Sequence, residues 1–387
     1  MIMIRNGLII TQDSRRRVFR GNVLIDGDTI EHVGQKSDRS DAVIDADGSI
    51  VMPGLINMHT HVGMTSLRGM VDCSSLESFL KATTEFDKRN TRDMIKKSAQ
   101  MAMEEMIATG TTSFLDLYYS EDAIAEVSSG IGMRAFLSWA VLDREYTTQR
   151  GNPLSNAEYF IRNNRKGMVT PSFGLQGVYA CSKDTIASTE ELAAKHGTLV
   201  HMHLAETMQE VKAHMDKHRM GPVAWMHKNG FLSKDLVAAH GVWIDSKERR
   251  MLASSGTTIV NNPISNARLN SGTAEVKSMI KNGINVTLGT DSAASNDSLD
   301  MFQTMKFSAL INRLTAQEAL DAATVKAGRA LGCNMGSIED GRKADVIVLS
   351  KDSLAAQPSV KTAVNIAVFA AQGKDVGASI INGRIVK

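Results

Sequence analysis

Eight short apolar runs, each rich in residues that favour β-strands, alternate along the middle of the chain with stretches of helical periodicity. The runs are VMPGLINMHTH, TTSFLDLYY, MRAFLSWAVL, TPSFGLQGVY, GTLVHMHLAE, LVAAHGVWI, GTTIVNNPIS and INVTLGTDSAAS. Nearly continuous apolar strands separated by amphipathic helices are typical of a parallel sheet that is buried on both faces. Eight such units over residues 51–331 therefore predict an α/β fold in which the strands close into a TIM-like (β/α)8 barrel.

The two ends of the chain differ from this middle part. Residues 1–50 contain short alternating runs on either side of Asp26, Gly27 and Asp28, which is a signal for a β-hairpin. Residues 332–387 have the same character, because Gly and Asn-Gly interrupt short runs of Val and Ile. We therefore expect residues 1–50 and 332–387 to form one small β-sandwich that packs against the barrel of residues 51–331.

Charge and cysteine content exclude several classes of protein. The chain has 44 Lys and Arg against 42 Asp and Glu, a formal net charge of +2, which gives no reason to expect a nucleic-acid partner. Polar residues interrupt the initial segment MIMIRNGLII, so we expect no signal peptide, no membrane partner and a cytoplasmic protein. Because Cys73, Cys181 and Cys333 lack CxxC spacing, we expect packed thiols rather than disulfides or a thiolate zinc site.

Histidines and acidic residues follow the predicted strands at the points where the strands end. In a barrel of this kind, functional side chains project from the carboxyl ends of the strands. Taken singly, each of these residues has an ordinary structural explanation, such as a buried hydrogen bond for a histidine or a helix cap for an aspartate. Their joint occurrence at one rim predicts a functional site that contains His59, His61, His203, Glu206, His240 and Asp291.

Three of these imidazoles and one carboxylate form a ligand set that suits a metal ion. The strand repeat of two residues puts His59 and His61 on the same face, and His203 and Asp291 complete the set. We expect one divalent ion, with zinc favoured and iron or manganese compatible with the same ligand types. Such an ion lowers the pKa of a bound water to about 7 and so makes it a nucleophile near neutral pH.

The other residues at this rim suit proton transfer. Glu206 is placed to move a proton between the water and a ring nitrogen of the substrate, and His240 to orient or stabilise the attacking oxygen. Asp291 is a second candidate for accepting the proton of the water. His201 lies two positions before His203, but it sits one step deeper in the barrel, and we interpret it as a structural residue.

The motifs PGLINMHTH, GTTSFLDLY, HMHLAET, AAHGVWI, NNPISNARLNSG and VTLGTDSAASNDSLDM extend over nearly the whole chain. Together they resemble the amidohydrolase superfamily, in particular the branch that includes S-adenosylhomocysteine and methylthioadenosine deaminases and triazine hydrolases. This resemblance implies a distorted barrel with a small β-sandwich made from both chain ends, and a homo-oligomer, either a dimer or a tetramer. It also implies a mononuclear metal site, because Lys183 lies beyond the position of the lysine that bridges two metals in other branches.

The activity implied by the resemblance is hydrolytic deamination of an adenosine-type nucleoside, with Glu206 protonating the ring nitrogen and ammonia leaving. The candidate substrates are methylthioadenosine, S-adenosylhomocysteine, deoxyadenosine and adenosine. Several positions that contact substrate in relatives carry other residues here. Gln176 and Asn261 each replace a histidine, and Phe79 replaces a tryptophan of the long connection 62–90, which is a candidate lid.

Contacts with the sugar and the tail follow from the same resemblance. Either Glu85 or Asp87 is expected to hold the ribose hydroxyls. Trp139 stands where relatives that bind a homocysteine carboxylate have an arginine, so a smaller or more apolar tail of the substrate is favoured. Arg150 is the other candidate for contact with such a carboxylate.

Two other classes of function stay open at this stage. One is an enzyme with the same metal chemistry but another substrate, such as a triazine-type chlorohydrolase or aminohydrolase or a guanine or cytosine deaminase. The other is a non-catalytic scaffold or binding protein, which is disfavoured because every ligand and catalytic position is filled.

Overall fold

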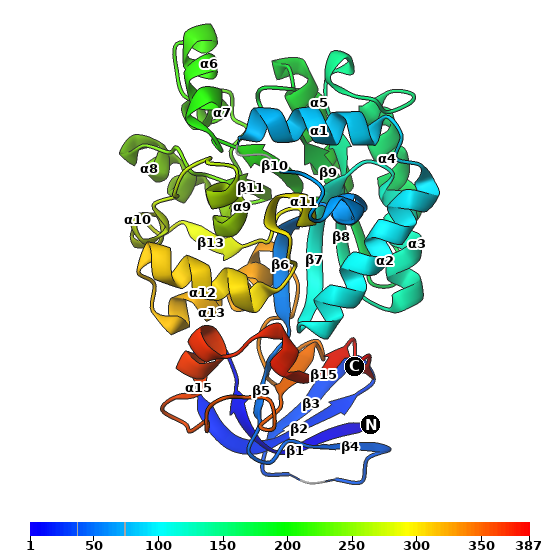
Figure 1. Cartoon of the computed structure of the whole chain (residues 1–387), viewed down its shortest axis with the longest axis vertical. Helices are drawn as coiled ribbons and strands as arrows, with labels where there is room; N and C mark the ends of the chain where they lie inside the picture. The colour runs from blue at the N-terminus through cyan, green and yellow to red at the C-terminus, as the bar shows by residue number, and fades with distance from the viewer. Residues whose placement is uncertain (37, 73–74) are drawn as a thin grey trace.

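The terminal segments and the middle of the chain form two separate sheets in the computed structural model, which describes residues 1–36, 38–72 and 75–387 (Figure 1). Eight parallel strands make up the first sheet in the order β13-β12-β11-β10-β9-β8-β7-β6. The backbone N–H of Asp291, just after β13, donates to the carbonyl of His59 in β6 at 2.9 Å. This bond joins the two edges of the sheet near their carboxyl ends, so the strands form a nearly closed barrel, and the predicted fold class is confirmed.

The barrel strands and their helices alternate along the chain. The strands are β6 (Leu55–Thr60), β7 (Thr111–Tyr118), β8 (Arg134–Val141), β9 (Val169–Leu175), β10 (Val200–Leu204), β11 (Leu236–His240), β12 (Thr258–Asn261) and β13 (Asn285–Leu288). The helices are η1 (Val62–Leu67), α1 (Leu76–Asp87), α2 (Arg92–Ala108), α3 (Glu121–Ile131), η2 (Arg144–Tyr146), α4 (Pro153–Asn164), α5 (Lys183–His196), α6 (Met208–His218), α7 (Pro222–Lys228), α8 (Ser246–Ser255), α9 (Pro263–Arg268), α10 (Val276–Lys281), α11 (Ala293–Asn296), α12 (Met301–Asn312), α13 (Ala316–Ala323) and α14 (Val325–Ala330).

Local sequence sets where these helices begin and end. The hydroxyl of Ser182 caps α5 by accepting the N–H of Thr185, and the helix ends at Gly197, which adopts a left-handed φ of 60°. Asp245 and Glu248 form a capping box at the start of α8. None of the described helices is both long enough and apolar enough to cross a membrane.

The second sheet contains strands from both ends of the chain, as the sequence predicts. Its strands are β1 (Ile2–Ile10), β2 (Val18–Asp26), β3 (Thr29–Gly34), β4 (Ala42–Asp45), β5 (Ile50–Pro53), β14 (Val346–Leu349), β15 (Val376–Ile381) and β16 (Arg384–Ile385). The pairing of Asp26 with Thr29 forms the hairpin predicted between β2 and β3. A separate apolar core that includes Ile4, Ile9 and Val23 lies under this sheet, and both termini lie in this part of the molecule (Figure 1).

One predicted strand is divided between the two sheets. In the run VMPGLINMHTH, residues 51–53 belong to β5 and pair with β1 and β14 of the terminal sheet, so the barrel begins at Leu55 and not at residue 51. The break falls at Gly54, where a Cβ atom would lie 2.1 Å from the hydroxyl oxygen of Thr112. The close approach of Thr112 therefore requires glycine at this corner.

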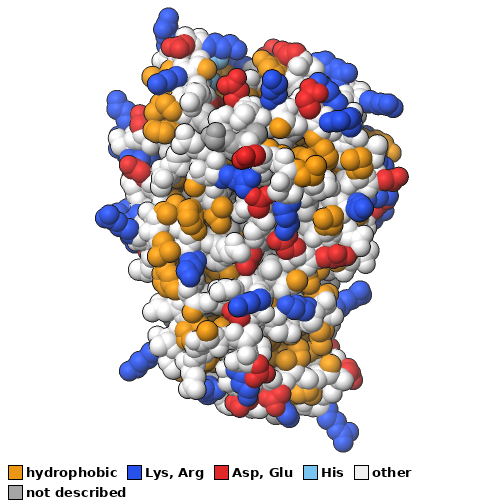
Figure 2. All heavy atoms as spheres, in the orientation of Figure 1, with side chains coloured by type: hydrophobic (Ala, Val, Ile, Leu, Met, Phe, Trp, Pro, Cys, Tyr) orange, Lys and Arg blue, Asp and Glu red, His pale blue; other side chains and the backbone are white. Residues whose placement is uncertain are grey.

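The C-terminal segment also departs from the expected short strands. Residues 363–370 form a helical turn, α15 (Ala363–Asn365) followed by η3 (Ile366–Ala370), before η4 (Gly373–Asp375). Their apolar side chains, including Ala367 and Val368, join the core of the barrel rather than that of the terminal sheet. Cys181 is buried and Cys333 is half-buried, and both are free, whereas Cys73 lies outside the described residues. Basic and acidic side chains are interspersed on the face shown in Figure 2.

Candidate metal centre and active site

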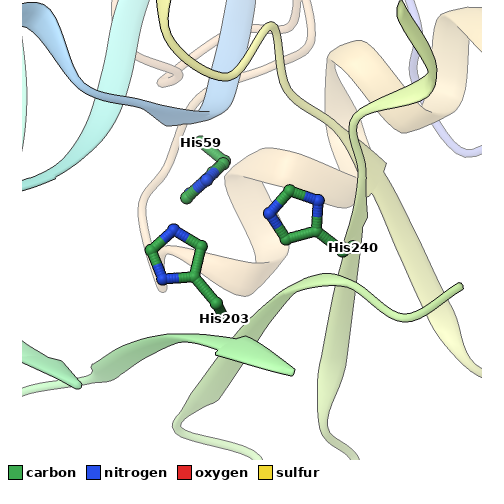
Figure 3. Close-up of side chains that lie close together, drawn as sticks. All are labelled: His59, His203 and His240. Atoms are coloured by element: carbon green, nitrogen blue, oxygen red, sulfur yellow. The ribbon is translucent and has the colours of Figure 1, made fainter. Parts of the chain in front are cut away.

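All six rim residues predicted from the sequence come together at the carboxyl ends of the barrel strands, and all are buried. His61 Nε2 lies 3.3 Å from Asp291 Oδ1 and 3.3 Å from His203 Nε2, and His59 Nε2 lies 3.5 Å from Asp291 Oδ1. The rings of His59, His203 and His240 point toward one another (Figure 3). Two groups of residues could each hold a metal ion: His59, His61 and Asp291, and His59, His203 and His240.

Backbone conformation helps to turn these side chains inward. His240 has a φ of 75° and Asp291 a φ of 62°, both in the left-handed region that residues other than glycine rarely occupy. Such conformations cost on the order of 1–3 kcal/mol each, so they persist only where surrounding contacts hold them, and they are common at functional sites. Here each one redirects the chain at the end of a strand, so that the side chain faces the site.

Each imidazole is held by a hydrogen bond through its outer nitrogen. His61 Nδ1 donates to the carbonyl of Leu117, and His203 Nδ1 donates to the carbonyl of Gln176 at 2.8 Å. Carbonyl oxygens accept only, so both rings carry their proton on Nδ1 and present the lone pair of Nε2 to the site. Partners of this kind fix the orientation and tautomer of histidines that bind metals.

His59 and His240 are oriented in the same way by side chains. His59 Nδ1 lies 2.9 Å from His201 Nε2, and His240 Nδ1 lies 2.8 Å from the amide oxygen of Asn266. His59 Nε2 is buried and has no hydrogen-bond partner among the described residues. Leaving a buried polar atom unpaired is costly, and a cation is the partner that satisfies several converging lone pairs at once. The donor set therefore fits a metal ion.

The electrostatic environment favours neutral rings at His59 and His203 beside an ionised carboxylate. Burial lowers the pKa of His59 and of His203 well below the usual value. Burial alone would raise the pKa of Asp291, but the neighbouring rings of His59 and His61 outweigh it and hold this pKa well below its usual range. Burial disfavours a charge on His61 as well, yet Asp291 raises the pKa of His61. A carboxylate therefore persists in this buried site as an anionic ligand.

Glu206 lies in the same site, next to His240. Its Oε1 accepts a hydrogen bond from the hydroxyl of Ser271 at 2.8 Å, and its Oε2 lies 3.6 Å from His240 Nε2. The carboxylate of Glu210 accepts the backbone N–H of Glu206 at 2.8 Å and so fixes the local turn. Burial raises the pKa of Glu206, which makes it better able to hold a proton and to give it to a substrate.

A cavity of about 340 Å³ extends from this cluster and suits a small molecule. Phe79, Asp87 and Gln176 line it, as expected for substrate contacts. Gln176 Nε2 donates to the hydroxyl of Tyr179 at 2.9 Å. Asn261 lies outside the lining, where it accepts a hydrogen bond from Ser308.

Three of the expected substrate residues do not reach this cavity. Glu85 is exposed and pairs with Lys88, whereas Asp87 lines the cavity. Of these two alternatives that the sequence left open for the sugar contact, Asp87 is therefore the one that reaches the cavity. Arg150 is exposed on a loop. The indole N–H of Trp139 donates to Gln149 Oε1 at 2.8 Å, and Gln149 rather than Trp139 lines the cavity, because the indole is held behind this loop.

Asp87 is held by two tyrosines that the sequence reasoning missed. The hydroxyls of Tyr118 and Tyr119 both donate to Asp87 Oδ1, the second at 3.1 Å, and the two rings stack with centroids 4.3 Å apart. Burial raises the pKa of Asp87 to about 6, although both hydrogen bonds oppose this shift. The sequence TTSFLDLYY predicts only the end of a strand. Its periodicity does not show that α1, which carries Asp87, lies next to the two tyrosines.

Comparisons with known proteins agree with this geometry. The sequence pattern of the amidohydrolase family matches residues 50–386. A 5-methylthioadenosine/S-adenosylhomocysteine deaminase of Thermococcus onnurineus is 34% identical over 100% of this chain and 93% of its own. A 5'-deoxyadenosine deaminase of Methanosarcina mazei is 35% identical over 100% of this chain and 92% of its own. The crystal structure of an adenosine deaminase from Xanthomonas campestris with bound zinc superposes with a TM-score of 0.93 at 25% identity, covering 99% of this chain and 92% of that one.

Proposed function

The chain belongs to the amidohydrolase family and is a hydrolase that acts on carbon–nitrogen bonds, and from this premise we propose that it deaminates an adenosine-type nucleoside with release of ammonia. The observation that carries the proposal is the position of Glu206. Its Oε2 lies 3.6 Å from His240 Nε2, next to a buried set of nitrogen and carboxylate ligands, at the inner end of a cavity. An acid beside a metal ligand set is the arrangement that hydrolytic removal of a ring amine needs.

The proposed cofactor is one zinc ion held by His59, His61, His203 and Asp291. The buried and unpaired Nε2 of His59 supports a cation at this point, as does the zinc in the similar adenosine deaminase. When bound, such an ion supplies a nucleophilic water near neutral pH. A single ion is favoured because no lysine lies among the described residues that line the cavity.

Three residues of the chain are proposed to move or direct protons. Glu206 in its protonated form donates to the ring nitrogen beside the carbon that carries the amine, and Asp291 accepts a proton from the water. That proton is passed to the leaving amine, and the second proton of the water, released when the oxo group forms, returns to Glu206, so one water and one aminated ring give one oxo ring and one ammonia. His240 presents its Nε2 lone pair to the attacking oxygen and orients it, because its Nδ1–H is already bonded to Asn266.

The other end of the cavity supports a ribose with a short, uncharged 5' substituent. Asp87 is the proposed partner of the sugar hydroxyls, because it is the acidic residue that lines this end. No Lys or Arg lies among the described residues that line the cavity, and Arg144 is bonded to the carbonyls of Gln149 and Gly151. A tail with a carboxylate would therefore lose its hydration without gaining a cationic partner. We expect 5'-deoxyadenosine and methylthioadenosine to be better substrates than S-adenosylhomocysteine.

The experiment is a measurement of ammonia release by zinc-replete protein from a panel of substrates. The panel contains 5'-deoxyadenosine, methylthioadenosine, adenosine, S-adenosylhomocysteine, guanine, cytosine and an aminated chlorotriazine. The highest kcat/KM is expected for the first two. Turnover of guanine, cytosine or the triazine without turnover of any adenosine would move the chain to another branch of the family, and no turnover at all would favour a binding protein.

Assembly of the chain stays a prediction. The resemblance to the family suggests a dimer or a tetramer, and light scattering after size-exclusion chromatography measures its mass. The substrate itself is proposed to be a small molecule, with no part for a nucleic acid.

A further inference from the structure

One short segment after β12 contacts functional groups that come from three other strands. The segment comprises residues 265–271, which are the second half of α9 and the turn that follows it. The hydroxyl of Ser265 donates to Asp291 Oδ2 at 2.6 Å, and the hydroxyl of Ser271 donates to Glu206 Oε1 at 2.8 Å. Asn266 Oδ1 accepts from His240 Nδ1 at 2.8 Å. These contacts belong to the motif NNPISNARLNSG, for which neither the metal ligands nor the proposed proton transfer accounts.

The segment is anchored from outside the site. Pro263 begins α9 two residues after β12 ends, which places Ser265 and Asn266 in the first turns of a helix that starts at the rim. Ser271 N donates to the carbonyl of Asn266 at 2.8 Å, and the indole N–H of Trp243 donates to the carbonyl of Ser271 at 2.7 Å. Asn270 takes a left-handed φ of 53°, which turns the chain back toward the site. The turn that carries Asn266 and Ser271 is thus held in place by hydrogen bonds that do not involve the site.

Each contact occupies the atom that faces away from the centre of the site. His240 Nδ1 and Glu206 Oε1 are bonded to the segment, while His240 Nε2 and Glu206 Oε2 face each other at 3.6 Å. Likewise Asp291 Oδ2 is bonded to the segment, while Asp291 Oδ1 faces His61. The segment therefore selects which atom of each group is available for chemistry.

All three contacts are made by neutral polar side chains. A hydroxyl and an amide fix the direction of a hydrogen bond but add no charge to a buried site, where an additional carboxylate would be costly. Asn266, Ser271 and Ser265 are all buried, so water competes little for these bonds. Orientation by neutral partners is therefore strong here and leaves the charge of the site to the ligands and to Glu206.

We propose that two side chains of the segment 265–271 position the reacting groups, with Asn266 the positioning residue of His240 and Ser271 that of Glu206. The expected effect on kcat rests on the proposed function. The orientation of His240 and Glu206 does not depend on which ring is the substrate. The effect on kcat and the orientation are separated by measuring kinetics and spectroscopy on the same variants.

The kinetic experiment compares Asn266→Ala and Ser271→Ala with Ala267→Ser, a change at an exposed position of the same helix. With 5'-deoxyadenosine and zinc-replete protein, we expect kcat to fall about 10- to 100-fold in each alanine variant, in line with the loss of an orienting partner. KM and zinc content are expected to stay within about 2-fold of the wild type, and Ala267→Ser to behave as wild type. Ser271→Thr keeps the hydroxyl and is expected to recover most of the rate. Alanine variants with an unchanged kcat, or a Ser271→Thr variant as slow as Ser271→Ala, would overturn the proposal.

The spectroscopic experiment does not depend on any substrate. Protein labelled with ¹⁵N-histidine and loaded with zinc reports the tautomer of each ring, and a His240→Gln variant identifies the signals of His240. We expect His240 to carry its proton on Nδ1 in the wild type and in Ala267→Ser, and to lose this single tautomer in Asn266→Ala. If the wild type releases no ammonia from any nucleoside, the proposed function fails, while this tautomer still supports the positioning role. An Asn266→Ala variant that keeps the Nδ1 tautomer of His240 would overturn that role.

Discussion

The Nε2 atoms of His61 and His203 lie 3.3 Å apart, although the two residues are 142 positions apart in the sequence. Both rings give their Nδ1 proton to a backbone carbonyl, so two lone pairs face each other across this distance. Such an arrangement is unfavourable unless a positive charge lies against both nitrogens. A metal ion supplies that charge, and Asp291 favours a positive charge at this point, since it raises the pKa of His61 against the effect of burial.

Removal of metal is therefore expected to abolish activity and to lower stability. An ion that binds only the folded chain stabilises it by about 2.7 kcal/mol when its free concentration is 100 times its Kd. We expect dialysis against a chelator to lower the midpoint of thermal unfolding by several degrees, and addition of Zn²⁺ to restore both the midpoint and ammonia release. Full activity after the zinc content has fallen below one tenth of an equivalent would rule out the proposed role of the metal.

Replacing Glu206 by glutamine tests the proposed proton transfer. The amide keeps the shape of the side chain and can still accept from Ser271, but it cannot give a proton to the ring. We expect kcat to fall by about 10²- to 10⁴-fold, with zinc content unchanged. Glu190→Gln is the matched control, because Glu190 is a partly buried carboxylate outside the cavity. Retention of the full rate by Glu206→Gln would exclude it as the proton donor.

The placement of the rim residues follows from the sequence because it depends on order along the chain. His59, His203 and His240 each lie at or near the carboxyl end of an apolar run, and in a parallel barrel these ends meet at one rim. Their proximity therefore needs no knowledge of the packing of side chains. Asp291 likewise follows shortly after the carboxyl end of the last barrel strand, β13.

Other features depend on contacts that the pattern of the sequence does not contain. The glycine at the break between β5 and β6, Gly54, is required by Thr112, which lies 58 positions later. The contact of Asn266 with His240 depends on the direction in which α9 leaves β12. Trp139 occupies a position where the resemblance suggested a substrate contact, yet its indole bonds to Gln149, because the intervening loop folds over it.

A pair of substitutions tests whether Asp87 or Glu85 holds the sugar hydroxyls of the substrate. If Asp87 accepts the sugar hydroxyls, Asp87→Asn removes a charged acceptor, and such a bond contributes about 1.5–3 kcal/mol. We expect KM for 5'-deoxyadenosine to rise about 10-fold or more. Glu85→Gln changes only an exposed ion pair with Lys88 and is expected to leave KM unchanged. The opposite pattern would assign the sugar contact to Glu85.

The pKa of Asp87 also predicts a pH dependence. Because burial raises this pKa from 3.8 to about 6, the folded protein favours the protonated acid, and ionisation costs stability as the pH rises through about 6. The ionised form is the better acceptor, so KM is expected to fall over the same range. In Asp87→Asn both effects should disappear, which denaturation curves from about pH 3.5 to about 7 and initial rates from about pH 5 to about 8 measure. A KM that is independent of pH in the wild type would contradict the assignment.

His201 is predicted to control the affinity for metal without binding it. Its Nε2 accepts the Nδ1 proton of His59, and its own Nδ1 lies 3.4 Å from the carbonyl of Asp116, so the pair fixes the tautomer of His59 that presents Nε2 to the ion. Burial lowers the pKa of His201 to about 3, which keeps the ring neutral and able to accept. We expect His201→Leu to weaken zinc binding about 10- to 100-fold in a competition with a chelator. His201→Gln, whose amide oxygen can accept the same proton, should recover part of the affinity, and His214→Leu, a buried histidine outside the cavity, should have none of this effect. Equal affinity in His201→Leu and the wild type would show that His201 only fills space in the barrel.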